Sequence, residues 1–299
     1  MPSIAHGLWQ WPGVVAWKNF RAQGIPYLVF PHGMLDPWFK HAFPLKHFKK
    51  QAYWWMRQGR ILRGAHAVCF TTEEERRLAQ KTFWPYRCRE VVTGLGVADP
   101  PPEGARQVDQ LLSKFPQLKD RKTLLYLGRM HPKKGLDLLI RSFLRQKREG
   151  ELLVLAGPLE PSDRHITNLQ RETKEYEDRI VWTDMLEGEM KWGALRYANA
   201  LILPSHQENY GMVVAESLSV GTPVFLTDKV NLWREVVEAN AGFVAPDSQA
   251  GIDQLIADWR MGKHQGMTED CLRCFEQSLH IRNCGQKVLD LLIESREAG

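Results

Sequence analysis

The stretch "PSHQENYGMVVAESLSVGTPV" (residues 204–224) places two glutamates, Glu208 and Glu216, eight positions apart around a tyrosine–glycine step. A polar segment followed by an apolar run predicts a loop that leads into a helix, and Gly221 with Pro223 predicts where that helix ends. We therefore expect Glu208 in the loop and Glu216 within the helix. Helix N-termini attract anions, so two carboxylates around one of them need an explanation.

Short apolar and β-branched runs recur on both sides of this stretch, and segments with helical periodicity separate most of them. The expected strands lie at 26–33, 67–72, 90–97, 123–129, 151–158, 179–186, 200–205, 222–228 and 241–246. Near-continuous apolar strands that alternate with helices are typical of parallel sheets covered on both faces. The sequence therefore predicts an α/β fold.

Tandem prolines in "DPPPEG" (residues 99–104) interrupt this pattern, and we place a domain boundary there, near residue 105. Residues 106–299 then contain five or six strands in series, whereas residues 1–105 contain about three, with a further contribution around Ile4. Three strands are few for a doubly wound sheet. We expect a whole second domain, an incomplete first one, and a last helix that packs back on the first.

Composition narrows the class of protein. The 299 residues are 43% hydrophobic and 25% charged, as in ordinary globular proteins. No apolar run reaches the ~20 residues that cross a bilayer, and no signal peptide precedes the first charges. Five cysteines are too few and too unevenly spaced for a disulfide scaffold, which favours a reducing, cytoplasmic setting.

Basic and aromatic residues gather in "WFKHAFPLKHFKKQAYWWMRQGRILR" (residues 38–63). Nucleic acid, an anionic membrane surface or an acidic ligand could each bind such a stretch. The alternative is a solvated helix whose aromatic side chains pack inward. The stretch matches no known nucleic-acid-binding module, so we expect no nucleic-acid partner.

The residues after each strand are the candidates for ligand binding, because open α/β sheets bind ligands at the carboxyl ends of their strands. The segment "GRMHPKKG" holds Arg129 and Lys134 between glycines, and both side chains suit phosphate oxygens. Glu208 and Glu216 would repel a bare phosphate but accept hydrogen bonds from sugar hydroxyls. These residues together favour a ligand with both groups, such as a nucleotide diphosphate-sugar.

Two motifs in this order resemble the signatures of glycosyltransferase family 4. "GRMHPKKGLDLLI" is similar to Gly-Arg-x4-Lys-Gly, and "ENYGMVVAE" is similar to Glu-x7-Glu. "HGLWQWPGVVAW" and "YLVFPHGMLDPW" resemble members that build bacterial surface polysaccharides. The resemblance covers nearly the whole chain and implies the GT-B fold, in which two Rossmann-like domains face each other across a cleft. It also implies retaining transfer from a nucleotide diphosphate-sugar to a hydroxyl of a lipid-linked or growing glycan.

The resemblance implies a role for each matching residue. Arg129 and Lys134 would neutralise the donor diphosphate, Glu216 would bind the ribose hydroxyls, and Glu208 would face the donor sugar. The residues implied in donor binding are Gly128, Arg129, Lys134, Tyr210, Gly211, Met212 and Glu216. Those implied at the reacting centre are His32, Arg129, Lys134 and Glu208. The basic pair makes a metal unnecessary, so we expect no metal and no cofactor besides the donor.

The chain departs from the family pattern at three places. Leu95 stands where the interdomain strand usually has asparagine, and Asp184 replaces a common glycine beside the base pocket. The strands and the glycine-rich loop that usually precede the segment around His6 are absent. We therefore expect an N-terminally truncated chain that binds nucleotide but transfers sugar poorly.

Other interpretations stay open. The chain could be a non-catalytic nucleotide-sugar-binding fragment, or a nucleotide-sugar epimerase of GT-B fold. The basic stretch could dock peripherally on the inner face of the cell membrane, as in family members that extend lipid-linked sugars. Cys271, Cys274, His280 and Cys284 could bind zinc, although helical periodicity alone would bring the first two together.

Overall fold

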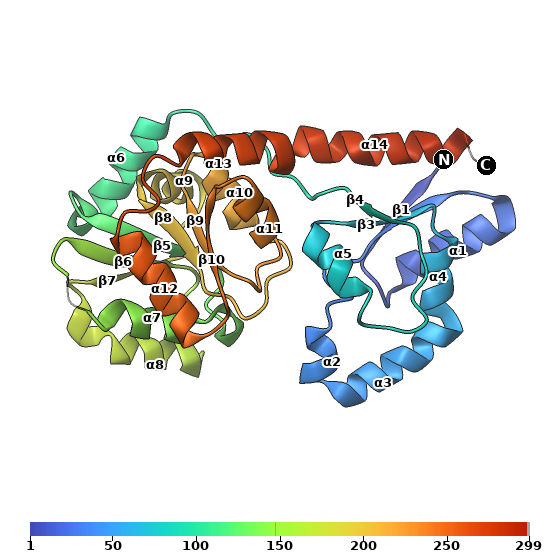
Figure 1. The fold of residues 1–299 in the computed structure, drawn as a ribbon, viewed down its shortest axis with the longest axis horizontal. Helices are drawn as coiled ribbons and strands as arrows, with labels where there is room; N and C mark the ends of the chain where they lie inside the picture. The colour runs from blue at the N-terminus through green and yellow to red at the C-terminus, as the bar shows by residue number, and fades with distance from the viewer. Residues whose placement is uncertain (147, 298–299) are drawn as a thin grey trace. The chain divides into compact units, whose positions relative to one another are not determined.

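The computed structural model describes residues 1–146 and 148–297, and its contacts divide the chain into two compact units (Figure 1). Unit 1 comprises Met1–Gly96 together with Ser278–Gly299, and unit 2 comprises Val97–Gln277. The division thus falls after Gly96 rather than near residue 105. The chain leaves unit 1 once and returns to it at the end.

Unit 1 contains a sheet of four parallel strands in the order β1-β2-β3-β4. Ile4 belongs to the first of these strands. The strands are β1 (Ser3–His6), β2 (Tyr27–Phe30), β3 (Ala67–Phe70) and β4 (Glu90–Val92). The helices are α1 (Trp11–Gln23), α2 (Trp38–Ala42), α3 (Pro44–Tyr53), the π-helical turn η1 (Trp54–Gln58), α4 (Gly59–Gly64), α5 (Glu73–Ala79) and α14 (Ile281–Glu297).

The sheet of unit 1 buries both faces, because successive side chains of a strand point to opposite sides. On one face, Tyr27 and Val29 pack into a cluster with Trp54. On the other face, Leu28, Phe30, Ala67 and Cys69 pack against Leu291, Val288 and Leu292 of α14. The last helix of the chain therefore covers a face of the first sheet.

Unit 2 contains a sheet of six parallel strands in the order β10-β9-β8-β5-β6-β7. The strands are β5 (Lys122–Leu127), β6 (Glu151–Ala156), β7 (Ile180–Asp184), β8 (Ala200–Leu203), β9 (Val224–Thr227) and β10 (Gly242–Ala245). The chain order reverses between β5 and β8, which is the topological switch point of a doubly wound sheet. Ligands of such sheets bind there, outside the carboxyl ends of the strands.

Helices lie on both faces of this sheet, with α7 and α8 on one side and α6 and α9 on the other (Figure 1). The helices and helical turns are α6 (Gly104–Lys114), η2 (Pro116–Leu118), η3 (Pro132–Lys134), α7 (Leu136–Leu144), α8 (Arg164–Glu172), η4 (Lys174–Tyr176), α9 (Gly188–Tyr197), α10 (Met212–Ser219), α11 (Trp233–Glu238), α12 (Gln249–Arg260), α13 (Thr268–Cys274) and η5 (Phe275–Leu279). All nine expected strands are present, so the predicted α/β fold is confirmed. No described helix combines the length and the apolar composition that a membrane-spanning segment requires.

Candidate functional site

A cavity of about 450 Å³ opens beside the carboxyl ends of β5, β6 and β7 in unit 2. Its walls are mostly apolar side chains and backbone, and two cations, Arg129 and Lys191, contribute to them. The lining residues are Leu127, Gly128, Arg129, Ala156, Gly157, Pro158, Met185, Leu186, Glu187, Gly188 and Lys191. An apolar pocket with a few charged groups is typical of a small-molecule site.

Backbone contacts between neighbouring loops form one wall of this cavity. Gly128 N–H donates to the carbonyl of Ala156 (2.9 Å), and Gly157 N–H donates to the carbonyl of Asp184 (3.1 Å). A Cβ atom at Gly157 would lie 1.9 Å from the carbonyl oxygen of Gly128. Glycine is therefore required at Gly157 for the loops after β5 and β6 to meet.

Asp184, the residue that replaces a common family glycine, has a left-handed backbone with φ of 60°. Glycine adopts this conformation without cost, and aspartate is among the few other residues that tolerate it. The Asp184 carboxylate accepts hydrogen bonds from the amides of Leu159 (3.0 Å) and Met185 (2.8 Å). The substitution thus keeps the backbone turn and fixes the loops after β6 and β7.

The two motifs that flank the switch point pack against each other. His206 N–H donates to the carbonyl of Lys133 (2.8 Å), which joins the loop after β8 to the loop after β5. Gly135 has φ of 64°, and a Cβ atom there would lie 2.2 Å from the carbonyl oxygen of Pro204. Two segments about 70 positions apart in the sequence therefore form one surface, and Gly135 lets them touch.

Each of the two glutamates in residues 204–224 forms an ion pair with a lysine. The buried ammonium of Lys134 donates to the Glu208 carboxylate, and Lys191 Nζ lies 2.8 Å from Glu216 Oε1. The four side chains are largely shielded from water, so each pair compensates charges that would be costly alone. The carboxylates are therefore neutralised by cations of the same site, which lets an anion approach them.

The predicted loop and helix are confirmed. Glu208 lies in the loop after β8, where its N–H donates to Lys229 O (2.9 Å) and its carbonyl accepts from Asn231 N–H (3.0 Å). Gly211, with φ of 77°, precedes α10, and Glu216 lies inside that helix. Tyr210 is buried and Met212 is half exposed. The N-terminus of α10 is thus held beside the Lys134–Glu208 pair.

Sequence reasoning missed Lys191. This residue belongs to α9, in the segment that follows β7, and it joins the cavity wall to Glu216. The available signal was a cation in the first turn of a helix that follows a strand, here the edge strand β7. Its partner lies 25 positions away in the sequence, so the pair could be found only from the fold.

In unit 1, His32 follows β2 and has an unusual left-handed backbone with φ of 49°. Its Nε2 lies 2.9 Å from Nδ1 of His6 at the end of β1, and both rings stack on Phe30. Burial, and then the proximity of His6, lowers the pKa of His32 below its usual value. The imidazole of His32 is therefore held neutral at physiological pH, with its ring fixed by its neighbours.

A buried carboxylate, which sequence reasoning also missed, fixes the loop that carries His32. Glu75 accepts hydrogen bonds from Gly33 N–H (2.5 Å) and from the amide and hydroxyl of Thr71 (2.7 and 2.6 Å). Burial raises the pKa of Glu75, and these three hydrogen bonds act in the opposite direction. Glu75 thus links the tips of β2 and β3. Thr72 begins α5 by accepting from Glu75 N–H (3.0 Å), a capping pattern visible in "TEEE" (residues 72–75).

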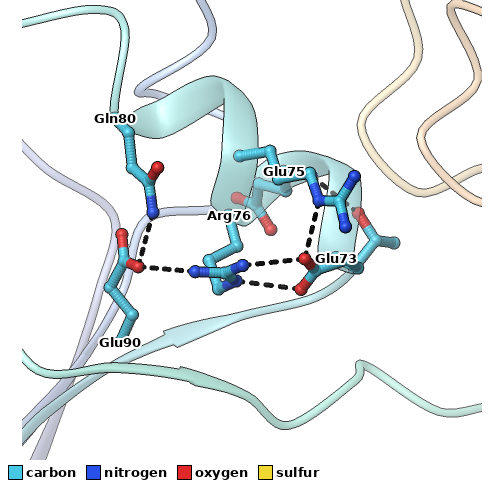
Figure 2. Close-up of polar contacts among 7 residues, drawn as sticks. Glu73, Glu75, Arg76, Gln80 and Glu90 are labelled. Atoms are coloured by element: carbon cyan, nitrogen blue, oxygen red, sulfur yellow. Dashed lines mark hydrogen bonds and ion pairs between the residues drawn. The ribbon is translucent and has the colours of Figure 1, made fainter.

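The helix that carries Glu75 is fastened to the sheet by ion pairs. Figure 2 shows Arg76 between Glu73 and Glu90, with 2.8 Å contacts to each, and Gln80 beside Glu90. The Arg76 guanidinium is the main reason that the pKa of Glu73 falls to about 2. Because Glu90 belongs to β4, Arg76 ties α5 to that strand.

The basic aromatic stretch does not pack inward as a whole. None of the described side chains of α3 is buried, and Leu45 and Phe48 are 82% and 73% exposed. Trp54, by contrast, is buried and stacks on Phe83 at 4.9 Å. Inward packing is therefore wrong for α3, and among the aromatic side chains of the turn that follows it, it holds for Trp54 but not for Trp55.

The three cysteines of residues 271–284 are buried and free. Cys271 donates to the carbonyl of Ala241 and Cys274 donates to that of Glu235. Burial raises the pKa of both thiols to about 12, so both are protonated at physiological pH. Within residues 1–146 and 148–297, no three His, Cys, Asp or Glu side chains are grouped so that they could hold a metal ion.

Comparison with solved structures relates this fold to known proteins. Sucrose-phosphate synthase from Thermosynechococcus elongatus matches with a TM-score of 0.77 and 18% identity, over 100% of this chain and 74% of that one. The Anabaena protein HepE, solved with UDP and glucose, matches with a TM-score of 0.76 and 15% identity, over 97% and 78%. These likenesses show the fold, which is GT-B.

Sequence comparison gives the family. The family described as "Glycosyl transferases group 1" matches residues 108–268, and "Glycosyl transferase 4-like domain" matches residues 2–95. An uncharacterized glycosyltransferase of Methanocaldococcus jannaschii is 29% identical over 146 residues, which cover 47% of this chain and 37% of that relative. The match thus spans little more than a third of that relative. Since the match to the first family covers more than half of the chain, the chain belongs to the group 1 glycosyl transferases.

Proposed function

We propose that this chain transfers a sugar from a nucleoside diphosphate-sugar to a hydroxyl of a glycan or lipid-linked acceptor, with retention of configuration. The observation that carries the proposal is the pairing of two lysines with two glutamates: Lys134 binds Glu208 in the loops after β5 and β8, and Lys191, in the wall of the 450 Å³ cavity, binds Glu216. Cations suit a diphosphate and carboxylates suit hydroxyls, and Arg129 and Lys191 both line the cavity. HepE, a protein of similar fold, was solved with UDP and glucose, which supports UDP as the nucleotide.

Each part of the donor has a proposed partner. The apolar cavity takes the base, Glu216 binds the ribose hydroxyls, and Arg129 and Lys134 neutralise the diphosphate. Glu208 and the amides of Tyr210, Gly211 and Met212 bind the sugar and the distal phosphate. We assign the donor to unit 2 and the acceptor side to unit 1, where His32 would approach the reacting sugar.

The proposed step breaks the bond between the anomeric carbon and the diphosphate oxygen and forms a bond from that carbon to the acceptor oxygen on the same face. The acceptor hydroxyl proton passes to the departing diphosphate. Negative charge builds on that diphosphate, so the largest catalytic effect is electrostatic stabilisation by Arg129, Lys134 and the N-terminus of α10.

A screen of nucleotide sugars tests this proposal. The protein is incubated with each donor and with candidate acceptors, and the released nucleoside diphosphate and the anomeric configuration of the product are measured. Release coupled to a retained glycosidic bond supports the proposal. Nucleotide binding without release would indicate a non-catalytic binding protein, and isomerisation of the donor sugar would indicate an epimerase.

We expect chelation to leave nucleotide binding and sugar transfer intact, because side-chain cations and helix amides supply the positive charge. Binding of UDP is measured by calorimetry before and after treatment with EDTA, and transfer is measured alongside. Loss of activity that magnesium or manganese restores would contradict this prediction.

His32→Gly should reduce sugar transfer strongly while it changes the stability of the protein little. The left-handed backbone costs an L-residue roughly 1–2 kcal/mol, and glycine adopts it freely but gains entropy when unfolded. The free energy of unfolding should therefore change by no more than about 1 kcal/mol, while transfer falls by roughly 100-fold, as when one transition-state contact is lost.

Asp120→Gly is the matched control for His32→Gly, since Asp120 also has a left-handed backbone, with φ of 59°. It should alter stability in the same sense and leave transfer unchanged. Unfolding in denaturant and initial rates of transfer give the two quantities. Full transfer by His32→Gly would remove His32 from the reacting centre.

We further propose that α3 contacts an anionic membrane surface peripherally. Residues 38–63 contain seven lysines and arginines and no aspartate or glutamate. Leu45 and Phe48 project from α3 into solvent among these cations. A helix with exposed apolar and cationic side chains is typical of a segment that lies in the headgroup region.

Leu45→Glu/Phe48→Glu should abolish binding to anionic vesicles, because it removes the exposed apolar side chains and adds negative charge. Leu289→Glu/Ile293→Glu on α14 is the control, since it changes two half-exposed apolar residues by the same charge. Binding of the unaltered protein should weaken with salt, because each cation contributes ~1 kcal/mol that ions screen. Equal flotation of all three proteins with anionic vesicles, or equal binding to neutral ones, would contradict the contact.

A further inference from the structure

A second hollow lies in unit 1, formed by residues that the proposed transfer does not use. It is an open groove of about 650 Å³ between the α2–α3 segment and the chain that joins α5 to β4. Its lining residues are Lys40, His47, Gln51, Gln80, Lys81, Thr82, Phe83, Trp84, Pro85, Tyr86 and Arg87. No carboxylate lies among them, whereas three lysines and arginines do.

Hydrogen bonds from the helical side hold the opposite wall of the groove. The Trp84 carbonyl accepts from Gln51 Nε2 (2.6 Å) and from Trp55 Nε1 (2.7 Å). The Pro85 carbonyl accepts from Trp54 Nε1 (2.9 Å). The backbone beside Trp84 is thus fixed, although the Trp84 residue itself is 74% exposed. The groove is therefore formed before any ligand arrives.

The cations of the groove are not neutralised by the protein. Among the ion pairs of the described residues, none involves Lys40, Lys81 or Arg87. Residues 1–96 contain 14 lysines and arginines but only five aspartates and glutamates, a net charge of +9, whereas the other 203 residues contain 26 and 30, a net of −4. The positive charge is therefore concentrated in the part of the sequence that forms this groove.

Four of the five acidic residues in residues 1–96 bind groups outside the groove, although Glu90 also accepts from Gln80 of its lining. Glu73 and Glu90 bind Arg76, Glu75 binds Gly33 and Thr71, and Asp36 accepts from the amide of Trp38. Like charges that line one concave surface repel each other, and a polyanion relieves that repulsion. Arginine and lysine together suit phosphate oxygens, and the exposed indole of Trp84 offers a flat apolar face beside them.

We propose that this groove binds a phosphate or diphosphate group, separately from the donor site of unit 2. Lys81 and Arg87 contact the phosphate oxygens from the α5–β4 side, and Lys40 contacts them from the α2 side. The lining also includes neutral polar side chains, among them Gln51, Gln80 and Thr82. The group could belong to a soluble phosphate ester or to a lipid headgroup, and the two sources are separable by experiment.

Calorimetric titration with inorganic pyrophosphate, in the presence of saturating UDP, measures the affinity of the groove for pyrophosphate while UDP fills the donor site. Lys81→Ala/Arg87→Ala should lower the affinity for pyrophosphate by roughly 100-fold, since it removes two charged contacts. Lys18→Ala/Arg21→Ala, which removes two exposed cations of α1, should leave it unchanged. Equal affinity in the parent and both variants, together with equal flotation in the measurement below, would overturn the proposal.

Flotation with vesicles that contain phosphatidic acid identifies the source. Weaker flotation of Lys81→Ala/Arg87→Ala than of Lys18→Ala/Arg21→Ala would assign the groove to a headgroup phosphate. If Lys81→Ala/Arg87→Ala weakens pyrophosphate binding but not flotation, the ligand of the groove is a soluble phosphate ester. If it weakens neither, the proposal is overturned. The groove variant should bind UDP like the parent. Failure of the parent to bind UDP would count against the donor site and not against the groove.

Discussion

Lys134→Ala should lower the affinity for UDP by roughly 100-fold. The substitution removes a charged hydrogen bond to the diphosphate, which contributes ~1.5–3 kcal/mol. It also leaves the partly buried Glu208 carboxylate without its cation, so that carboxylate repels the incoming diphosphate. Arg129→Ala loses only its own contact, so we expect a smaller decrease of roughly tenfold. Calorimetric titration with UDP measures both.

Three controls make this prediction specific. Lys133→Ala removes the neighbouring, half-buried cation and should change the affinity little. Lys134→Ala/Glu208→Ala should regain part of the lost affinity, because the uncompensated carboxylate is gone. Glu216→Ala should weaken binding of uridine, which Arg129→Ala should not. If Lys134→Ala and Arg129→Ala both bind UDP like the parent, the donor site is wrongly assigned.

Gly135→Ala should be among the most damaging single substitutions in the chain. The new methyl group would lie 2.2 Å from the carbonyl oxygen of Pro204, and the left-handed backbone adds strain. Either the two motif loops separate or the backbone of β8 shifts. We expect a loss of about 3 kcal/mol or more in the free energy of unfolding, as for overpacked sites. Because Lys134 would move away from Glu208, UDP binding should fall as well.

Gly150→Ala is the matched control for Gly135→Ala. Gly150 has φ of 78°, and nothing lies within 4 Å of a Cβ atom built there. The free energy of unfolding of Gly150→Ala should therefore fall only by the cost of the left-handed backbone, roughly 1–2 kcal/mol, and UDP binding should be unchanged. Chemical denaturation of both variants gives the comparison. Equal losses would show that the contact with Pro204 is unimportant.

The strands and the loop–helix position of the two glutamates were predictable, because local patterns determine them. Near-continuous apolar runs, separated by segments with helical periodicity, predicted all nine expected strands. The polar segment before "MVVAESLS" predicted Glu208 before the helix and Glu216 within it. The sequence also showed which residues follow each strand, although not the order of the strands in the sheets. These features depend on residues within about one element of each other.

The ion pairs and the loop supports were not predictable, because they join residues that are distant in sequence. Lys191 meets Glu216 only after β7 and β8 take their places, and Glu75 reaches Gly33 across 42 positions. Asp184 looked like a departure from the family pattern until its φ of 60° explained it. The sequence led us to expect a last helix on the first domain, but not the side chains that make the contact, where Leu291 packs with Leu28 and Ala67.

The return of α14 to unit 1 sets an order of events during translation. Leu28, Phe30, Ala67 and Cys69 emerge from the ribosome early, but Leu291, which covers them, is made more than 200 residues later. Unit 2 must be synthesised in between, and at ~5–20 residues per second that interval lasts roughly 10–40 s. Throughout it one face of the first sheet is open to water, to chaperones and to other nascent chains. The Cys69 thiol, whose pKa burial later raises to about 12, is then accessible to oxidants, and the apolar face can associate with other apolar surfaces until α14 covers it.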